Sequence, residues 1–204
     1  SLTLEVVNAD NASAFAGSEF RDPTVLLRHS GFYDLGADAY FELGLNGVRG
    51  PNDEEGHLDT TVASLDFNLV WEPVQRAKYR GFELRGELIR TRFETEIDGT
   101  FRSTSFYTYA MWKLGRQWIL GLRYDDAELP WPGIELHDEQ PFTEGLRERA
   151  WSPILTFWQS EFVRLRLQYQ HVSRDAVWAH GPDDDDRLWV QVTFAAGPHK
   201  HEAY

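Results

Sequence analysis

Hydrophobic and polar residues alternate along most of this chain with a period of two. In the segment 162–170, Leu165 and Leu167 take one parity. Arg164 and Arg166 take the other parity, together with two glutamines. Because successive side chains of a β-strand point to opposite faces of a sheet, this segment is predicted to be a strand with one apolar face and one charged face.

The same alternation recurs in segments separated by turn-forming or acidic stretches, and no segment has a convincing helical period. We therefore expect an all-β fold of about ten strands. The expected strands are residues 3–7, 24–36, 39–48, 62–71, 82–90, 105–115, 118–124, 150–158, 162–170 and 187–195.

The connections between these segments alternate between short and long. The short ones are residues 35–38, 72–81, 114–117 and 159–161; the long ones are 8–23, 49–59, 94–102, 125–147 and 173–186. This alternation is typical of up-and-down outer-membrane barrels, which have short periplasmic turns and long outer loops. We expect one domain over residues 1–204: an antiparallel up-and-down transmembrane β-barrel of about ten strands, or the C-terminal ten strands of a larger barrel.

Strand parity alone does not distinguish the two kinds of barrel that could produce it. In a soluble barrel the apolar face forms the interior, whereas in an outer-membrane barrel it faces lipid and the charged face lines the lumen. The alternating loop lengths favour the outer-membrane barrel. A soluble β-barrel that binds a ligand remains the alternative.

Composition narrows the classes of function. The net charge is −13, so a nucleic-acid partner is not expected, because phosphate binding needs basic surface. Mean hydropathy is −0.49, and no apolar run is long enough for a transmembrane helix, whereas barrel strands need only about 9–11 alternating residues. The chain has no cysteine, which excludes disulfides and cysteine-bound zinc.

The C-terminal third carries a family resemblance. The segments "ILTFWQSEFVRLRLQYQHV" and "DRLWVQVTFAAGPHKHEAY" resemble the end of porin-like outer-membrane proteins of Gram-negative bacteria, described as phosphate-selective-porin-like or as zinc-regulated outer-membrane receptors. The segment "RAKYRGFELRGELIRTRFE" looks like a middle part of the same family. The resemblance implies location in the outer membrane, contact with its lipid, and passage of small solutes or ions, with metal uptake among the related functions and homo-oligomers among the related assemblies.

The charged residues at alternate positions of the expected strands form the candidate functional site. In an outer-membrane barrel these side chains would line the lumen, where they could select the ions that pass. They could equally pair across strands and only stabilise a wet interior. The candidate lumen residues are Asp66, Glu83, Arg85, Glu87, Arg123, Arg164 and Arg166.

The C-terminal tail offers a weaker candidate for metal binding. His199 and His201 are two residues apart, and Glu202 follows them, which suits zinc or a similar transition metal. Scattered, solvated histidines would give the same sequence. We expect no resident cofactor, and zinc is the metal to test.

An enzymatic alternative rests on His171 and Ser173, which share a strand parity about a dozen residues before the acidic run 183–186. A His-x-Ser pair is similar to that of outer-membrane lipid A deacylases. That resemblance implies His171 as base, Ser173 as nucleophile and one of the aspartates as orienting group. Arg174 stands where that family has an asparagine, and we do not expect an enzyme.

Overall fold

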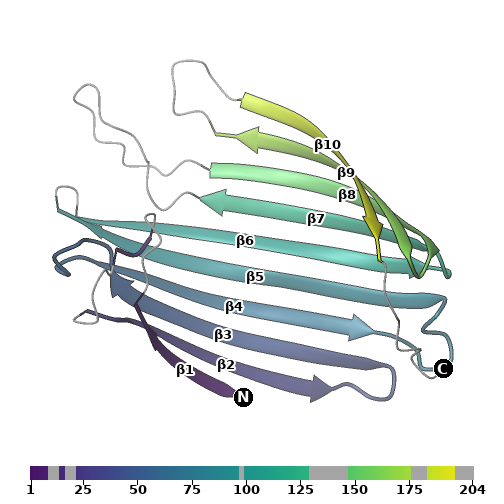
Figure 1. The fold of residues 1–204 in the computed structure, drawn as a ribbon, viewed down its shortest axis with the longest axis horizontal. Helices are drawn as coiled ribbons and strands as arrows, with labels where there is room; N and C mark the ends of the chain where they lie inside the picture. Colours follow the sequence, from purple (N-terminus) through teal and green to yellow (C-terminus); the bar gives the residue numbers. More distant parts are fainter. Residues whose placement is uncertain (9–13, 17–21, 97–98, 129–146, 176–182, 196–204) are drawn as a thin grey trace.

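The computed structural model describes residues 1–8, 14–16, 22–96, 99–128, 147–175 and 183–195. These residues form one antiparallel sheet whose strands follow one another in chain order (Figure 1). The strands are β1 (Leu2–Val7), β2 (Thr24–Asp34), β3 (Ala39–Pro51), β4 (Asp59–Trp71), β5 (Arg80–Thr95), β6 (Gly99–Leu114), β7 (Trp118–Glu128), β8 (Arg147–Ser160), β9 (Val163–Arg174) and β10 (Asp183–Phe194). The expected all-β, up-and-down antiparallel architecture is confirmed.

Four of the five expected long connections are shorter in the structure, because residues assigned to them continue the strands. Thr95 of β5 pairs directly with Gly99 of β6, so only residues 96–98 lie between the two strands, rather than the long link predicted over 94–102. The acidic run 183–186 pairs with the end of β9 and forms the start of β10. The strict alternation of loop lengths is therefore wrong at the β5–β6 connection.

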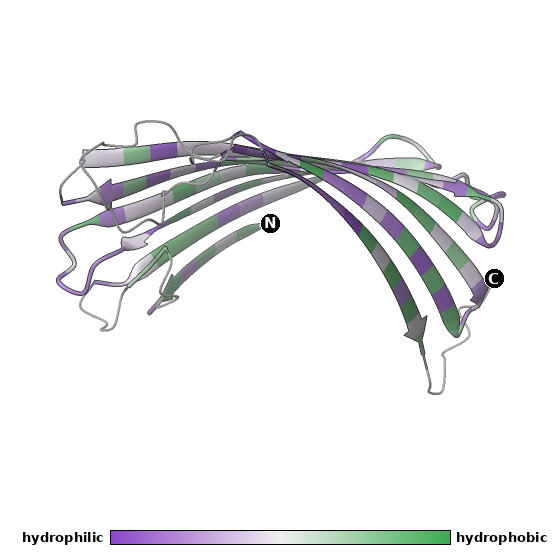
Figure 2. Cartoon of the chain, turned by 90° about the horizontal axis from the view of Figure 1, so that it is seen from above, coloured by the Kyte–Doolittle hydropathy of each residue, from purple (hydrophilic) through white to green (hydrophobic). Residues whose placement is uncertain are grey.

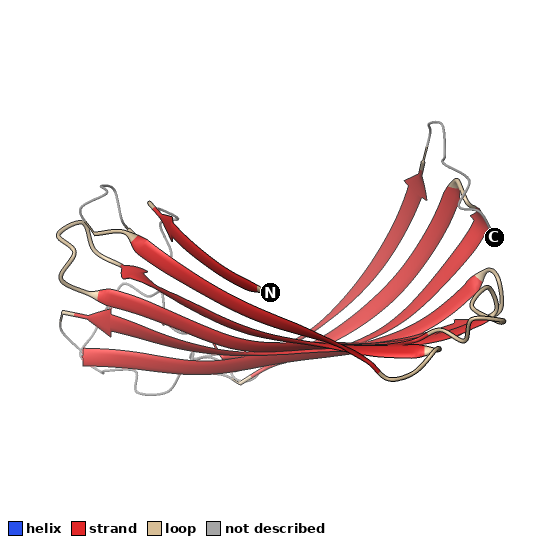
Figure 3. Cartoon of the chain, turned by 90° about the horizontal axis from the view of Figure 1, so that it is seen from below, coloured by secondary structure: helices blue, strands red, loops and turns tan. Residues whose placement is uncertain are grey.

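The sheet is curved but open. Figure 3 shows a trough in which β1 and β10 form the two opposite rims. Each strand pairs with its neighbours in the chain, and no pairing joins β1 to β10. The described residues therefore do not form a closed ten-stranded barrel, and the expectation that they are the wall of a larger barrel stays a prediction.

The two faces of the trough differ in polarity, and Figure 2 shows the alternation as coloured bands along the strands. The apolar residues Leu27, Leu45 and Leu65 are 48%, 50% and 38% exposed on their face. Side chains of the other parity, such as Ser152 and Thr156, are nearly inaccessible, as expected on the concave side of a curved sheet. The concave face is thus the polar face, and the convex face is the apolar face.

The sheet is a single layer, because no second layer covers either face within the described part of the chain. The buried hydrophobic residues there are Ala150, Ile154 and Val172, all on the concave side of β8 and β9. The large leucines and aromatic residues of the convex face remain exposed. No helix among the described residues is long and apolar enough to cross a membrane.

Aromatic side chains gather near both ends of the convex face. At the end with short turns, Trp118 packs on Phe157 with ring centroids 4.6 Å apart, and Phe82 packs on Trp112 at 5.9 Å. Towards the other end, Tyr124 packs on Trp151 at 4.4 Å. Leucines dominate the band between these two rows.

Candidate functional site

All seven charged residues predicted from parity lie on the concave face. Asp66 is on β4, Glu83, Arg85 and Glu87 are on β5, Arg123 is on β7, and Arg164 and Arg166 are on β9. The register places Asp66 opposite Glu87. It also places Tyr109 of β6 between Arg85 and Arg123. The first five residues therefore form one continuous patch, whereas the β9 arginines lie apart from it.

The patch begins with a network across β2, β3 and β4. Arg28 donates to the Asn46 side-chain oxygen at 2.6 Å and approaches Asp66 at 3.6 Å. The Asn46 amide donates to Asp66 Oδ2 at 2.9 Å. These contacts compensate the negative charge of Asp66, which lies opposite a second carboxylate, Glu87, on the next strand.

In the middle of the sheet each arginine has a carboxylate partner on its own strand. Arg85 Nη2 lies 2.8 Å from Glu83 Oε1. Arg123 Nε donates to both Asp125 oxygens, at 2.9 and 2.8 Å. The same guanidinium groups lie over aromatic rings of β6, and this stacking fixes them against the sheet. Arg85 is 5.7 Å from the Tyr109 centroid and Arg123 is 5.1 Å from that of Tyr107.

The two arginines of β9 differ, because their hydrogen-bond partners are neutral. Arg166 donates to the side-chain oxygen of Gln168 at 2.9 Å, and Arg164 donates to the Thr193 hydroxyl at 3.3 Å. Arg164 also lies 5.6 Å over the Trp158 ring, and its Nε is buried without a hydrogen-bond partner among the residues that the structure describes. No carboxylate within the described residues forms an ion pair with either arginine. Among the arginines of the concave face in the described part of the chain, the two without a carboxylate partner are therefore both on β9.

Several members of this patch were missed by sequence reasoning. Asp125 lies two residues beyond Arg123, so the same parity would have found it had the predicted strand not ended at residue 124. Tyr107 and Tyr109 lie in a stretch with aromatic residues at both parities, so their face could not be assigned. Arg28 lies in a strand whose alternation is blurred around His29.

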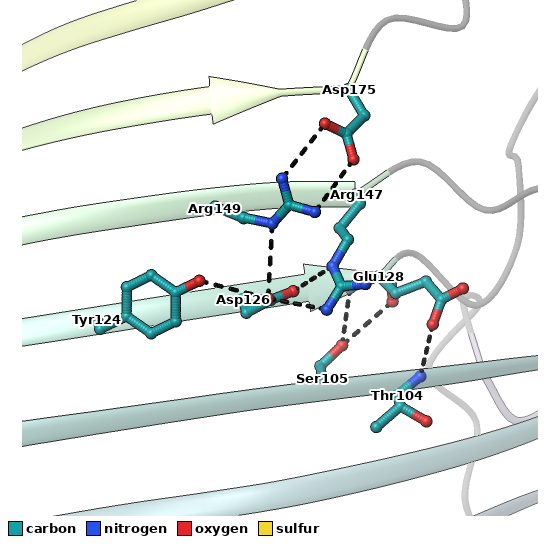
Figure 4. Close-up of polar contacts among 8 residues, drawn as sticks. All are labelled: Thr104, Ser105, Tyr124, Asp126, Glu128, Arg147, Arg149 and Asp175. Carbon is teal, nitrogen blue, oxygen red and sulfur yellow. Dashed lines mark hydrogen bonds and ion pairs between the residues drawn. The ribbon is translucent and has the colours of Figure 1, made fainter.

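A second group of charged residues lies on the convex face, at the end of β7 and the start of β8 (Figure 4). Asp126 is its centre, with a side chain only 6% exposed. Arg147 donates to the two Asp126 oxygens at 2.6 and 2.8 Å. Arg149 lies 3.7 Å from Asp126 and 3.5 Å from Asp175, so this cluster ties β7, β8 and the end of β9 together.

The structure brings together only part of the predicted hydrolytic set. His171 Nδ1 lies 2.8 Å from Asp186 Oδ1, and the Tyr169 hydroxyl donates to the same oxygen at 2.6 Å. Asp186 is thus an aspartate of the acidic run that contacts His171. Ser173 has the same parity as His171 and pairs with Asp184 across the strands. Within the described residues, no hydrogen bond joins Ser173 to His171.

The predicted metal ligands His199, His201 and Glu202 lie outside the described residues. Within the described part of the chain, no group of three or more histidine, aspartate or glutamate side chains could hold a metal ion. Zinc binding by the tail stays a prediction.

Comparison with known proteins identifies no relative: no family model, no curated protein and no solved structure matches the chain. The resemblance to porin-like outer-membrane proteins therefore stays a prediction that rests on the segments quoted above.

Proposed function

We propose that this chain forms part of the wall of an outer-membrane β-barrel that lets small solutes or ions pass. The convex apolar face would contact lipid, and the concave polar face would line the path. The direction of the curvature supports this assignment. A soluble barrel encloses its apolar face, whereas this sheet curves around its polar face.

The distribution of aromatic and aliphatic residues on the convex face supports contact with lipid. The six residue steps from Trp118 to Tyr124 span roughly 20 Å at about 3.4 Å per step in a strand. In a tilted strand this length covers part of the roughly 25 Å apolar band of outer-membrane barrels, which aromatic rows flank on both sides. Along β7 the convex positions between these two aromatics are the uncharged Leu120 and Leu122.

The β9 arginines are the observation on which the proposed selectivity rests. Arg85 and Arg123 are compensated by Glu83 and Asp125, whereas Arg164 and Arg166 have neutral partners. An uncompensated positive charge on the wall of a path attracts anions and repels cations. We expect β9 to favour anionic solutes at its part of the wall.

A closed path requires partners for the free edges of β1 and β10, because an unpaired strand edge is not tolerated in lipid. Those partners would be further strands of a longer chain or strands of another copy. Membrane insertion can be tested by heat-modifiable gel migration of the native protein extracted from an outer-membrane fraction. Recovery of the protein only from a soluble fraction, with migration independent of heating, would support the soluble ligand-binding module instead.

Selectivity can be tested in a planar bilayer with a salt gradient. The double variant Arg164→Ala/Arg166→Ala is expected to shift the reversal potential towards cation permeation. Arg76→Ala/Arg80→Ala removes the same charge next to the β4–β5 turn and serves as the matched control. Unchanged reversal potentials in the β9 variant would contradict the proposed role of the two arginines.

The His171–Asp186 contact favours a second candidate function, hydrolysis of a lipid ester at the membrane surface. In this function Asp186 orients the imidazole, and Ser173 is the nucleophile. The refolded protein would be assayed for esterase and deacylase activity together with Ser173→Ala. Equal activity in the two proteins, or none in either, would remove this candidate.

A further inference from the structure

A shallow depression of about 680 Å³ interrupts the leucine-rich convex face between β2 and β5. It exists because Gly47 and Ala63 lie directly opposite each other on β3 and β4 and contribute almost no side-chain volume. Leu27, Leu45, Leu65 and Leu88 surround this gap. The depression is therefore apolar and open to whatever contacts the convex face.

Arginines stand at one end of this depression. A smaller hollow shares Ala63 and Arg90 with it, so the two are adjacent, and the smaller one is also lined by Arg92 and Arg102. The register places Ala63 opposite Arg90, and Arg92 opposite Arg102, on adjacent strands. The convex face thus passes directly from an apolar groove to a group of three exposed arginines.

The charge of this group is only partly compensated. Arg92 forms an ion pair with Glu94 at 3.1 Å. Among the described residues, Arg90 and Arg102 form no ion pair and no side-chain hydrogen bond. By contrast, Arg147 and Arg149 on β8 share the buried carboxylate of Asp126. Two arginines without a carboxylate partner among the described residues therefore lie beside the depression.

From this arrangement we infer that the depression binds a membrane lipid whose headgroup carries phosphate. One acyl chain would lie over Gly47 and Ala63 between the surrounding leucines. The phosphate would accept hydrogen bonds from Arg90 and Arg102, because guanidinium groups bind phosphate through paired, charge-assisted hydrogen bonds. The inference rests on the proposed function, in which the convex face contacts lipid, and adds the class of lipid and its position.

The test measures lipid retained by the native protein after gel filtration in detergent. Dioleoylphosphatidate and dioleoylphosphatidylcholine are compared, because they share acyl chains and differ in headgroup charge. We expect the parent protein to retain phosphatidate preferentially. Arg90→Gln/Arg102→Gln is expected to lower that retention by roughly fivefold for each arginine removed. Arg76→Gln/Arg80→Gln removes equal charge near the β4–β5 turn and should retain phosphatidate like the parent.

A second variant tests the groove separately from the charge. A Cβ added at Gly47 would meet no atom within 4 Å, so a side chain there starts in open space, and Gly47→Leu is the variant that places one in the depression. This variant is expected to lose retention of both lipids while keeping its fold. Equal retention of the two lipids by the parent would overturn the inference. Loss of phosphatidate to the same extent in both arginine double variants would also overturn it.

Heat-modifiable migration and channel conductance, measured on the same preparations, separate this inference from the proposed function. A parent that migrates heat-modifiably and conducts, but shows no preference for phosphatidate, would disprove the lipid site alone. A parent that neither migrates heat-modifiably nor conducts would disprove both. Heat-modifiable migration of the two arginine variants shows that a lost lipid reflects a lost contact and not an unfolded chain.

Discussion

Arg166 donates a hydrogen bond to Gln168 two residues further along β9, at 2.9 Å. Arg123 makes the same contact along β7, but its partner is the carboxylate of Asp125. Both arginines therefore bond to the side chain two positions further along their strand, but only Arg123 bonds to a carboxylate. The difference between an amide and a carboxylate at this position determines whether the arginine charge is compensated.

Exchanging these two partners should change ion selectivity in opposite directions. Gln168→Glu gives Arg166 a carboxylate and is expected to shift the reversal potential towards cation permeation. Asp125→Asn removes the charge that neutralises Arg123 and is expected to shift it towards anion permeation. Reversal potentials in a planar bilayer under a salt gradient are the measurement. Gln117→Glu, in the β6–β7 turn, adds the same negative charge away from this face and should leave them unchanged; shifts of equal sign in the first two variants would contradict the prediction.

Asp126 should contribute to stability through its pair of bonds to Arg147. Asp126→Asn removes the charge from a nearly inaccessible carboxylate, and we expect a loss of about 1.5–3 kcal/mol in the free energy of unfolding, the range for hydrogen bonds to charged groups. Urea unfolding followed by tryptophan fluorescence measures this loss. Asp175→Asn is the matched control, because Asp175 is exposed and its contacts to Arg149 are 3.5 Å long. Equal losses in the two variants would show that burial of the carboxylate is not what matters.

Gly44 should not tolerate a side chain, because a Cβ there would overlap the carboxylate of Asp66 on the neighbouring strand. Gly44→Ala is expected to displace Asp66 from Asn46 and to cost about 1–3 kcal/mol, as overpacking usually does. Gly47→Ala on the same strand meets no atom within 4 Å and serves as the control. Thermal unfolding of the two variants gives the comparison, and a Gly44→Ala midpoint equal to that of the control would refute the expected overlap.

The β3–β4 loop should loosen in acid through Asp53. Burial acts to raise the pKa of Asp53, but backbone hydrogen bonds from Leu58 and His57, at 2.9 and 3.2 Å, outweigh it and lower the pKa. A carboxyl whose pKa is lowered in the folded state stabilises it above the unfolded pKa, and this contribution is lost as the pH falls through the folded pKa. Acid should therefore weaken the loop, and neutral or higher pH should not.

Amide hydrogen exchange of His57 and Leu58 measures this effect. We expect their protection, relative to that in Asp53→Asn, to fall severalfold as the pH drops below the ordinary range of an aspartate pKa. Dividing by the variant removes the intrinsic dependence of exchange on pH. A ratio that stays constant over the acid range would show that the Asp53 carboxylate does not hold the loop.

The sequence by itself determined the strands and their two faces. Strand parity is a local property, so Leu165 and Arg164 could be assigned to opposite faces without knowledge of any other strand. The same reasoning placed Asp66, Arg85 and Arg166 on one face. The reasoning failed where polar residues continue a strand. The acidic residues 183–186 were assigned to a loop, yet they pair with β9.

Only the tertiary structure decided the register, and with it the contacts that give each charge its environment. Parity cannot show that Gly47 lies opposite Ala63, that Asp186 contacts His171, or that Arg166 donates to an amide rather than to a carboxylate. These relationships join residues on different strands, and pairing across strands is set by the whole sheet. The same is true of the open trough, because curvature and the free edges of β1 and β10 are properties of all the strands together.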